Sequence, residues 1–91
     1  MLALNADTFE SVALDKALDV FVMFVGGGLC KLCDDFFPVF VKAAKVFSRT
    51  SNLRFATINM GANELEDATV YYYPTVRMYP RDSKHRPFDY D

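Results

Sequence analysis

The sequence lacks the features that mark a membrane-spanning protein, a nucleic-acid-binding protein or a secreted precursor. Its longest apolar run, residues 20–25, is far shorter than the ~20 residues of a membrane-spanning helix. The ten Lys and Arg and twelve Asp and Glu residues are scattered rather than clustered. No basic surface is therefore available for nucleic acid or an anionic membrane, and we expect neither as a partner. Residues 1–7 also lack the basic start and long apolar stretch of a signal peptide.

Cysteines are scarce, because only Cys30 and Cys33 occur in the chain. A bridge between them would close a loop so short that it removes little entropy from the unfolded chain. The pair is therefore a poor structural staple, and its spacing indicates redox chemistry or metal binding instead.

Hydrophobic residues are abundant: they make up 52% of the 91 residues and include nine Phe and five Tyr. This composition excludes disorder, and a chain of this length has material for one hydrophobic core. No repeat or linker interrupts the sequence, so we expect residues 1–91 to form a single α/β domain.

The residue patterns predict strands that alternate with helices. A short edge strand is expected at Leu2–Leu4. Asp7 followed by Glu10 predicts a helix that has Asp7 as its N-cap and runs to about Lys16. The Val- and Phe-rich residues 20–25 predict a central parallel strand that is covered on both faces.

A long amphipathic helix is expected to begin at the cysteines, because apolar residues recur after them at helical spacing. Pro38 lies inside this helix and predicts a kink. The later elements are expected as a strand at 53–58, a short helix beginning at 63–66, a strand at 75–79 and a final antiparallel strand at 87–90.

The position of the cysteines favours redox chemistry. At a helix N-terminus the free N–H groups and the helix dipole stabilise an anion, so Cys30 is placed to form a thiolate. Cys33, one turn later, is within reach to attack a mixed disulfide. Two alternatives remain open: a pair of buried structural thiols, or metal bound between two chains. His85 is the single histidine, so a complete zinc site within one chain would need added carboxylate ligands.

Several motifs together resemble a catalytic domain of the protein disulfide isomerase family, within the thioredoxin superfamily. The resemblance extends over almost the whole chain. It rests on the strand at 20–25, Cys30-x-x-Cys33, Pro38 eight positions after the first cysteine, Phe55-Ala56-x-Ile58, Tyr73-Pro74-Thr75, Tyr79-Pro80 and Phe88-Asp89-Tyr90.

The resemblance implies a thioredoxin-like α/β fold, a central mixed sheet with helices on both faces, and thiol–disulfide exchange on cysteine-containing polypeptides. Cys30 is then the nucleophile and Cys33 the resolving thiol, with no cofactor and no metal. The Tyr73–Pro74 bond is expected to be cis and to lie beside the cysteines. The substrate-binding residues implied by the resemblance are Tyr73, Pro74, Leu29 and Leu32.

The family also implies a setting for this chain. Its domains carry one more helix after the last strand, and this sequence stops at Asp91. We therefore expect a domain from a longer, multi-domain protein, with one apolar face of its sheet uncovered. The implied partners are unfolded or disulfide-bonded polypeptides and other domains of the parent protein, and the implied compartment is the lumen of the endoplasmic reticulum.

Departures from the family motif support a second hypothesis. Leu29 replaces a common Trp, Leu32 a common His or Pro, and Asp34 a common Lys or Arg. Phe24 stands where the family has a buried acid that accepts the proton of the second cysteine. A domain with these changes could mainly bind client peptides or partner domains, with impaired redox activity. The retention of both cysteines favours the enzyme.

Overall fold

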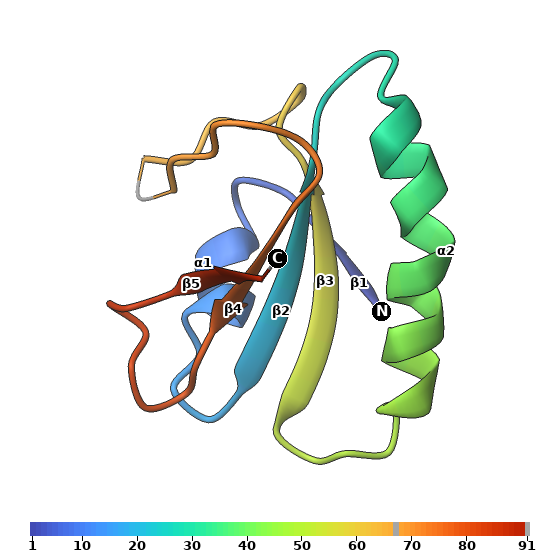
Figure 1. Ribbon diagram of the computed structural model, residues 1–91. Coiled ribbons are helices and arrows are strands. Elements are labelled where there is room, and N and C mark those ends of the chain that lie inside the picture. Colours follow the sequence, from blue (N-terminus) through green and yellow to red (C-terminus); the bar gives the residue numbers. More distant parts are fainter. Residues whose placement is uncertain (67, 91) are drawn as a thin grey trace.

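The computed structural model describes residues 1–66 and 68–90. It contains a five-stranded sheet with a helix on each face (Figure 1). The elements in chain order are β1 (Leu2–Leu4), α1 (Phe9–Ala13), β2 (Asp19–Val25), α2 (Lys31–Val46), β3 (Leu53–Asn59), β4 (Thr75–Tyr79) and β5 (Phe88–Tyr90). None of the described helices is long and apolar enough to cross a membrane.

The sheet is mixed and has the order β1-β3-β2-β4-β5. β1 and β2 both run parallel to β3, and β2 pairs with β3 over its whole length, from Asp19 opposite Leu53 to Val25 opposite Asn59. β4 runs antiparallel to β2, and β5 runs antiparallel to β4. The predicted central position of β2 and the antiparallel final pair are confirmed.

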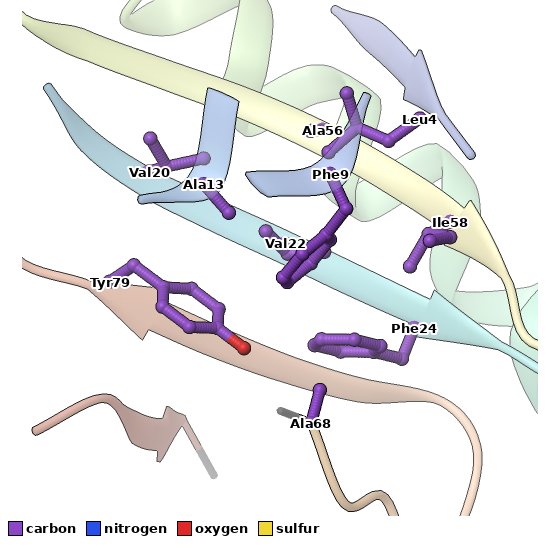
Figure 2. Close-up of a cluster of buried hydrophobic side chains, with 10 residues drawn as sticks. All are labelled: Leu4, Phe9, Ala13, Val20, Val22, Phe24, Ala56, Ile58, Ala68 and Tyr79. Carbon is purple, nitrogen blue, oxygen red and sulfur yellow. The ribbon is translucent and has the colours of Figure 1, made fainter. Parts of the chain in front are cut away.

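Side chains of β2 alternate between two hydrophobic clusters, one on each face of the sheet. Val20, Val22 and Phe24 are fully buried on the α1 face, where Phe24 lies 6.1 Å from Phe9 between ring centroids (Figure 2). Met23, also fully buried, belongs to the cluster on the α2 face. A strand buried on both faces has to be apolar throughout, which explains the continuous run in the sequence.

The α2 face is incompletely covered. A groove of about 410 Å³ runs between α2 and the sheet. Phe88 and Tyr90 of β5 are 52% and 65% exposed. The groove is lined by Phe21, Phe36, Val39, Phe40, Ala43, Phe47, Phe55, Pro74, Val76 and Tyr90. This face of the sheet therefore carries an open apolar groove.

Two helix predictions are wrong. The first helix ends at Ala13 rather than near Lys16, and its N-cap is Thr8 rather than Asp7. The Asn5 side chain accepts the N–H groups of Asp7 and Thr8, so it performs the capping that the sequence pattern assigned to Asp7. This turn between β1 and α1 uses an Asx side chain to bind its own backbone, and the local bonds displace the helix start.

The expected helix beginning at 63–66 is also absent, because residues 63–66 and 68–70 are not helical. The Asn63 side chain instead joins two other segments. Its amide donates to the Asn59 carbonyl, and its oxygen accepts the N–H of Ala6. Leu65, Ala68 and Val70 pack against the α1-face cluster in an irregular segment. Tertiary contacts therefore override the capping pattern.

Lys84 ties together three segments at the end of the sheet away from the cysteines. Its Nζ donates to the carbonyl oxygens of Ala13 at 2.9 Å, Leu18 at 2.5 Å and Tyr79 at 2.8 Å. Ala13 is the last residue of α1, Leu18 precedes β2, and Tyr79 is the last residue of β4. Burial lowers the pKa of Lys84, and the nearby charges of Asp19 and Asp15 oppose that shift in part.

We predict that Lys84→Met destabilises the domain. A hydrogen bond to a charged group contributes about 1.5–3 kcal/mol, but the desolvation of Lys84 offsets part of the three bonds, so we expect a loss of about 1–2 kcal/mol. For a domain of this size this corresponds to a fall in Tm of roughly 4–16 °C. Lys16→Met, at an exposed position, is the control. Equal Tm values for the two variants would contradict a stabilising role for Lys84.

Candidate functional site

Cys30 and Cys33 lie where β2 leads into α2, at the carboxyl end of the central strand. Cys30 is the N-cap of α2, and its Sγ accepts the backbone N–H of Cys33 at 3.2 Å. The two residues form a disulfide with their Cα atoms 5.2 Å apart. The expected location at the helix start is confirmed, and α2 continues through Pro38 to Val46.

The two sulfur-bearing residues differ in exposure. Cys33 is 5% exposed and packs with Met23, Phe40 and Val76 on the α2 face. Cys30 is half-buried at the edge of the same cluster. An incoming reagent therefore meets Cys30 more easily than Cys33, as the position at the helix start predicts.

The segment that enters β4 lies at the same end of the sheet as the cysteines (Figure 1). The Tyr73–Pro74 peptide bond is cis, as expected. The antiparallel pairing of β2 with β4 ends at the pair Phe24 and Thr75. Pro74 directly precedes Thr75 in the chain, so it lies at the level of Val25. The Thr75 hydroxyl donates to the Tyr72 carbonyl at 2.6 Å and holds this turn.

Tyr73 contacts the hydrophobic clusters on both faces of the sheet. Its half-buried ring packs against both hydrophobic clusters, including the one that contains the cysteines. A Cβ on Gly26 would lie 3.0 Å from this ring, so the glycine gives Tyr73 its place against the turn after β2. The Tyr73 side chain is therefore structural, which leaves its backbone as the part able to contact an extended peptide.

Exposed apolar side chains occur next to Cys30 in the sequence and on the segment that leads to Pro74. Leu29 is 106% exposed and Leu32 is 67% exposed, on either side of Cys30 in the sequence. Tyr71 is 87% exposed and Tyr72 is 60% exposed on the segment that leads to Pro74. Of the four substrate-binding candidates, Leu29 and Leu32 project into solvent, whereas Tyr73 and Pro74 are half-buried.

The charges beside the cysteines fall on two sides of the helix. The Lys31 ammonium pairs with the Asp35 carboxylate at 3.2 Å, and both side chains are exposed. Asp34 instead lines a pocket that both cysteines also line. Lys31 therefore neutralises Asp35, and Asp34 is the charged residue of the disulfide's own pocket.

Phe24 lies on the opposite face of the sheet from Cys33. It is fully buried, and the Arg77 guanidinium carbon lies 5.2 Å from its ring centroid. The same guanidinium donates to the Thr69 carbonyl and to the Asp89 carboxylate. The position where the resemblance implies a buried acid thus holds an aromatic ring that contacts the Arg77 guanidinium.

A close contact between two loops was missed by the sequence analysis. The turns after β2 and β3 meet at Gly27 and Gly61, where a Cβ on Gly27 would lie 2.8 Å from the Gly61 Cα. Met60 also donates its N–H to the Val25 carbonyl at 2.8 Å. The sequence does contain a signal for this contact, because a glycine follows shortly after each of the two predicted strands.

Within residues 1–66 and 68–90, no group of three or more His, Cys, Asp and Glu side chains could hold a metal ion.

Comparisons with known proteins agree with the geometry. The protein disulfide-isomerase 1 of Caenorhabditis elegans is 34% identical over 88 residues, which cover 97% of this chain and 18% of that protein. The protein disulfide-isomerase of Drosophila melanogaster is 32% identical over 89 residues, with the same coverage. The chain belongs to the protein disulfide isomerase family. It spans less than a fifth of the length of these relatives, and no family model matches it.

A solved structure confirms the thioredoxin-like fold. The crystal structure of the J-Trx1 fragment of ERdj5 superposes with a TM-score of 0.76 and 24% identity, covering 99% of this chain and 41% of that chain.

We predict that Gly27→Ala destabilises the loops of this thioredoxin-like domain. The added methyl would meet the Gly61 backbone, and overpacking of this kind costs about 1–3 kcal/mol. Urea unfolding measures the loss. Gly28→Asn is the control for space alone: its Cβ would meet nothing within 4 Å, so its cost is the strain of a side chain at a φ of 73°, which Asn adopts more readily than most residues. A Gly27→Ala variant as stable as the wild-type protein would show that the loops separate freely.

Proposed function

We propose that this domain catalyses thiol–disulfide exchange on cysteine-containing polypeptides. The observation that carries the proposal is the Cys30–Cys33 disulfide at the start of α2, with Cys30 half-buried and Cys33 buried. The helix dipole and the Cys33 N–H both stabilise negative charge on the Cys30 sulfur. The relationship to the disulfide isomerases supports the same activity.

The exchange proceeds through a mixed disulfide. In reduced protein, the Cys30 thiolate attacks a substrate disulfide, forms a bond to one substrate sulfur and releases the other as a thiolate. Cys33 then loses its proton and attacks the Cys30 sulfur. The bond between Cys30 and the substrate breaks, the substrate leaves as a thiolate, and the intramolecular disulfide forms. The substrate has been reduced and the cysteine pair oxidised.

Leu29, Leu32, Tyr73 and Pro74 form the proposed peptide-binding surface. The exposed leucines supply apolar contact beside Cys30, and the backbone at Tyr73 is available for pairing with an extended chain. Unfolded or disulfide-bonded polypeptides are the proposed substrates, because they expose apolar side chains and extended backbone that such a surface can bind. Other domains of a longer protein are further proposed partners, because the relatives extend well beyond the matched region.

The endoplasmic reticulum lumen is the proposed compartment. Its oxidising environment allows disulfide pairs to form and persist, whereas the cytosol keeps thiols reduced. The relationship to the disulfide isomerases supports this assignment.

A client-binding domain with weak redox activity is the second candidate. Its support is the apolar surface formed by Leu29 and Leu32 together with Asp34, a charge that disfavours a thiolate on Cys30. Insulin reduction separates the two candidates: an enzyme reduces insulin with turnover, whereas a binding domain suppresses aggregation of unfolded protein without turnover.

We predict that Cys33→Ser traps mixed disulfides with substrate peptides, because the resolving thiol is removed while the nucleophile remains. Non-reducing mass spectrometry detects the adduct. Cys30→Ser is the matched control and should trap none, since Cys33 is buried. Adducts formed by Cys30→Ser alone would reverse the assigned roles.

We also predict that Leu32→His makes the domain a stronger oxidant. A histidine between the cysteines can donate a hydrogen bond to the Cys30 thiolate and so stabilise the reduced form. A gain of about 1.4 kcal/mol would raise the reduction potential by about 30 mV, which equilibration with glutathione measures. Val39→His, at an exposed position of the same helix, should leave the potential unchanged. A shift of equal size in both variants would point to general charge rather than to contact with Cys30.

A further inference from the structure

The proton of Cys33 needs a destination during exchange. Cys33 is 5% exposed, and its neighbours in the α2-face cluster are apolar apart from Cys30 and the phenol-bearing Tyr73. A thiol in such surroundings resists ionisation, because burial disfavours the charged form. Phe24 offers no carboxylate, and its ring lies on the other face of the sheet. A proton acceptor has to reach Cys33 from elsewhere.

A pocket beside the disulfide contains a carboxylate. It has a volume of about 200 Å³ and is lined by Val25, Gly26, Gly28, Cys30, Cys33, Asp34, Phe37 and Thr57. Among the described residues that line it, Asp34 is the one besides the cysteines that carries a titratable side chain. The pocket is large enough to admit water, and the Asp34 carboxylate and Thr57 hydroxyl can both hydrogen-bond to it.

The first turn of α2 places the exposed Asp34 beside the cysteines. Its N–H donates to the Cys30 carbonyl at 3.0 Å in the first turn of α2, and Asp34 directly follows Cys33. Asp35, one residue further, turns to the other side and pairs with Lys31. The elements that face Asp34 across the pocket are β2 with its following turn and β3. They contribute Val25, Gly26, Gly28 and Thr57, none of which is charged.

We propose that Asp34 is the proton acceptor for Cys33 in the resolving step, acting through water in this pocket. The proposal rests on the exchange reaction proposed above. The Asp34 carboxylate takes the Cys33 proton, the resulting thiolate attacks the Cys30 sulfur, and the Cys30–substrate bond breaks. The departing substrate thiolate then takes the proton from Asp34 through the same water. Protons and electrons balance without another reactant.

This role predicts effects of opposite sign on the two chemical steps. A negative charge beside Cys30 disfavours its thiolate, so removing the charge should speed or preserve the first attack. Removing a proton acceptor should slow the second attack, typically by about 10²–10⁴-fold for a directly positioned group. We expect about tenfold or more for a base acting through water. An electrostatic effect alone would speed both steps, because it would favour both thiolates.

The test is single-turnover oxidation of the reduced domain by oxidised glutathione. Rapid acid quenching and mass spectrometry follow the glutathione adduct on Cys30 and its conversion to the intramolecular disulfide. Asp34→Asn should slow the conversion by about tenfold or more while iodoacetamide labels Cys30 at an equal or higher rate. Asp35→Asn is the matched control and should change the conversion by less than about twofold. Asp34→Glu should retain most of the rate.

Chemical rescue separates a proton acceptor from a structural residue. Asp34→Ala leaves space in the pocket, so added acetate should restore the conversion in proportion to its concentration. The same acetate should leave the wild-type protein and Asp35→Asn unchanged. Conversion in Asp34→Asn at the wild-type rate or faster would overturn the proposal, as would an Asp34→Ala variant that acetate does not rescue. A wild-type domain that forms no glutathione adduct would instead refute the exchange activity itself.

Discussion

Burial of β2 on both faces of the sheet is the constraint from which the rest of the domain follows. Val20, Val22 and Phe24 need cover on one face, and Met23 needs it on the other. One helix packs on each face, and parallel and antiparallel neighbours satisfy the backbone of the strand on its two sides. Because the strand is fixed in this way, its carboxyl end is a rigid platform for the turn that carries Cys30.

The redox site joins that rigid platform to less regular segments. The disulfide lies at the first turn of α2, whereas the cis-proline turn follows an irregular segment that Tyr73, Thr75 and Arg77 hold in place. The glycine contact at Gly27 fixes the turn after β2 against the turn after β3. The surroundings of the disulfide are therefore held by side chains and turns well outside the two-cysteine motif.

The residues around the cysteines differ from the family pattern in where they place negative charge. Phe24 stands where the family resemblance implies a buried acid, and the Asp34 carboxylate lies in the pocket beside the sulfurs. The carboxylate opposes a thiolate on Cys30 electrostatically and offers a base to Cys33. These two effects act on successive steps, so slow initial attack is compatible with efficient resolution.

The sequence alone determined the strands, the long helix and the cysteine site. Period and residue type encode these features directly: a continuous apolar run predicts a doubly buried strand, and a helix start activates a thiol. Only the tertiary structure decided the first helix, which Asn5 caps, and the segment at 63–66, where the Asn63 side chain bonds distant backbone instead of starting a helix. It also decided that Asp34 shares a pocket with the disulfide while Asp35 does not. Such choices depend on which groups the folded chain brings within hydrogen-bonding distance, and local sequence patterns do not carry that information.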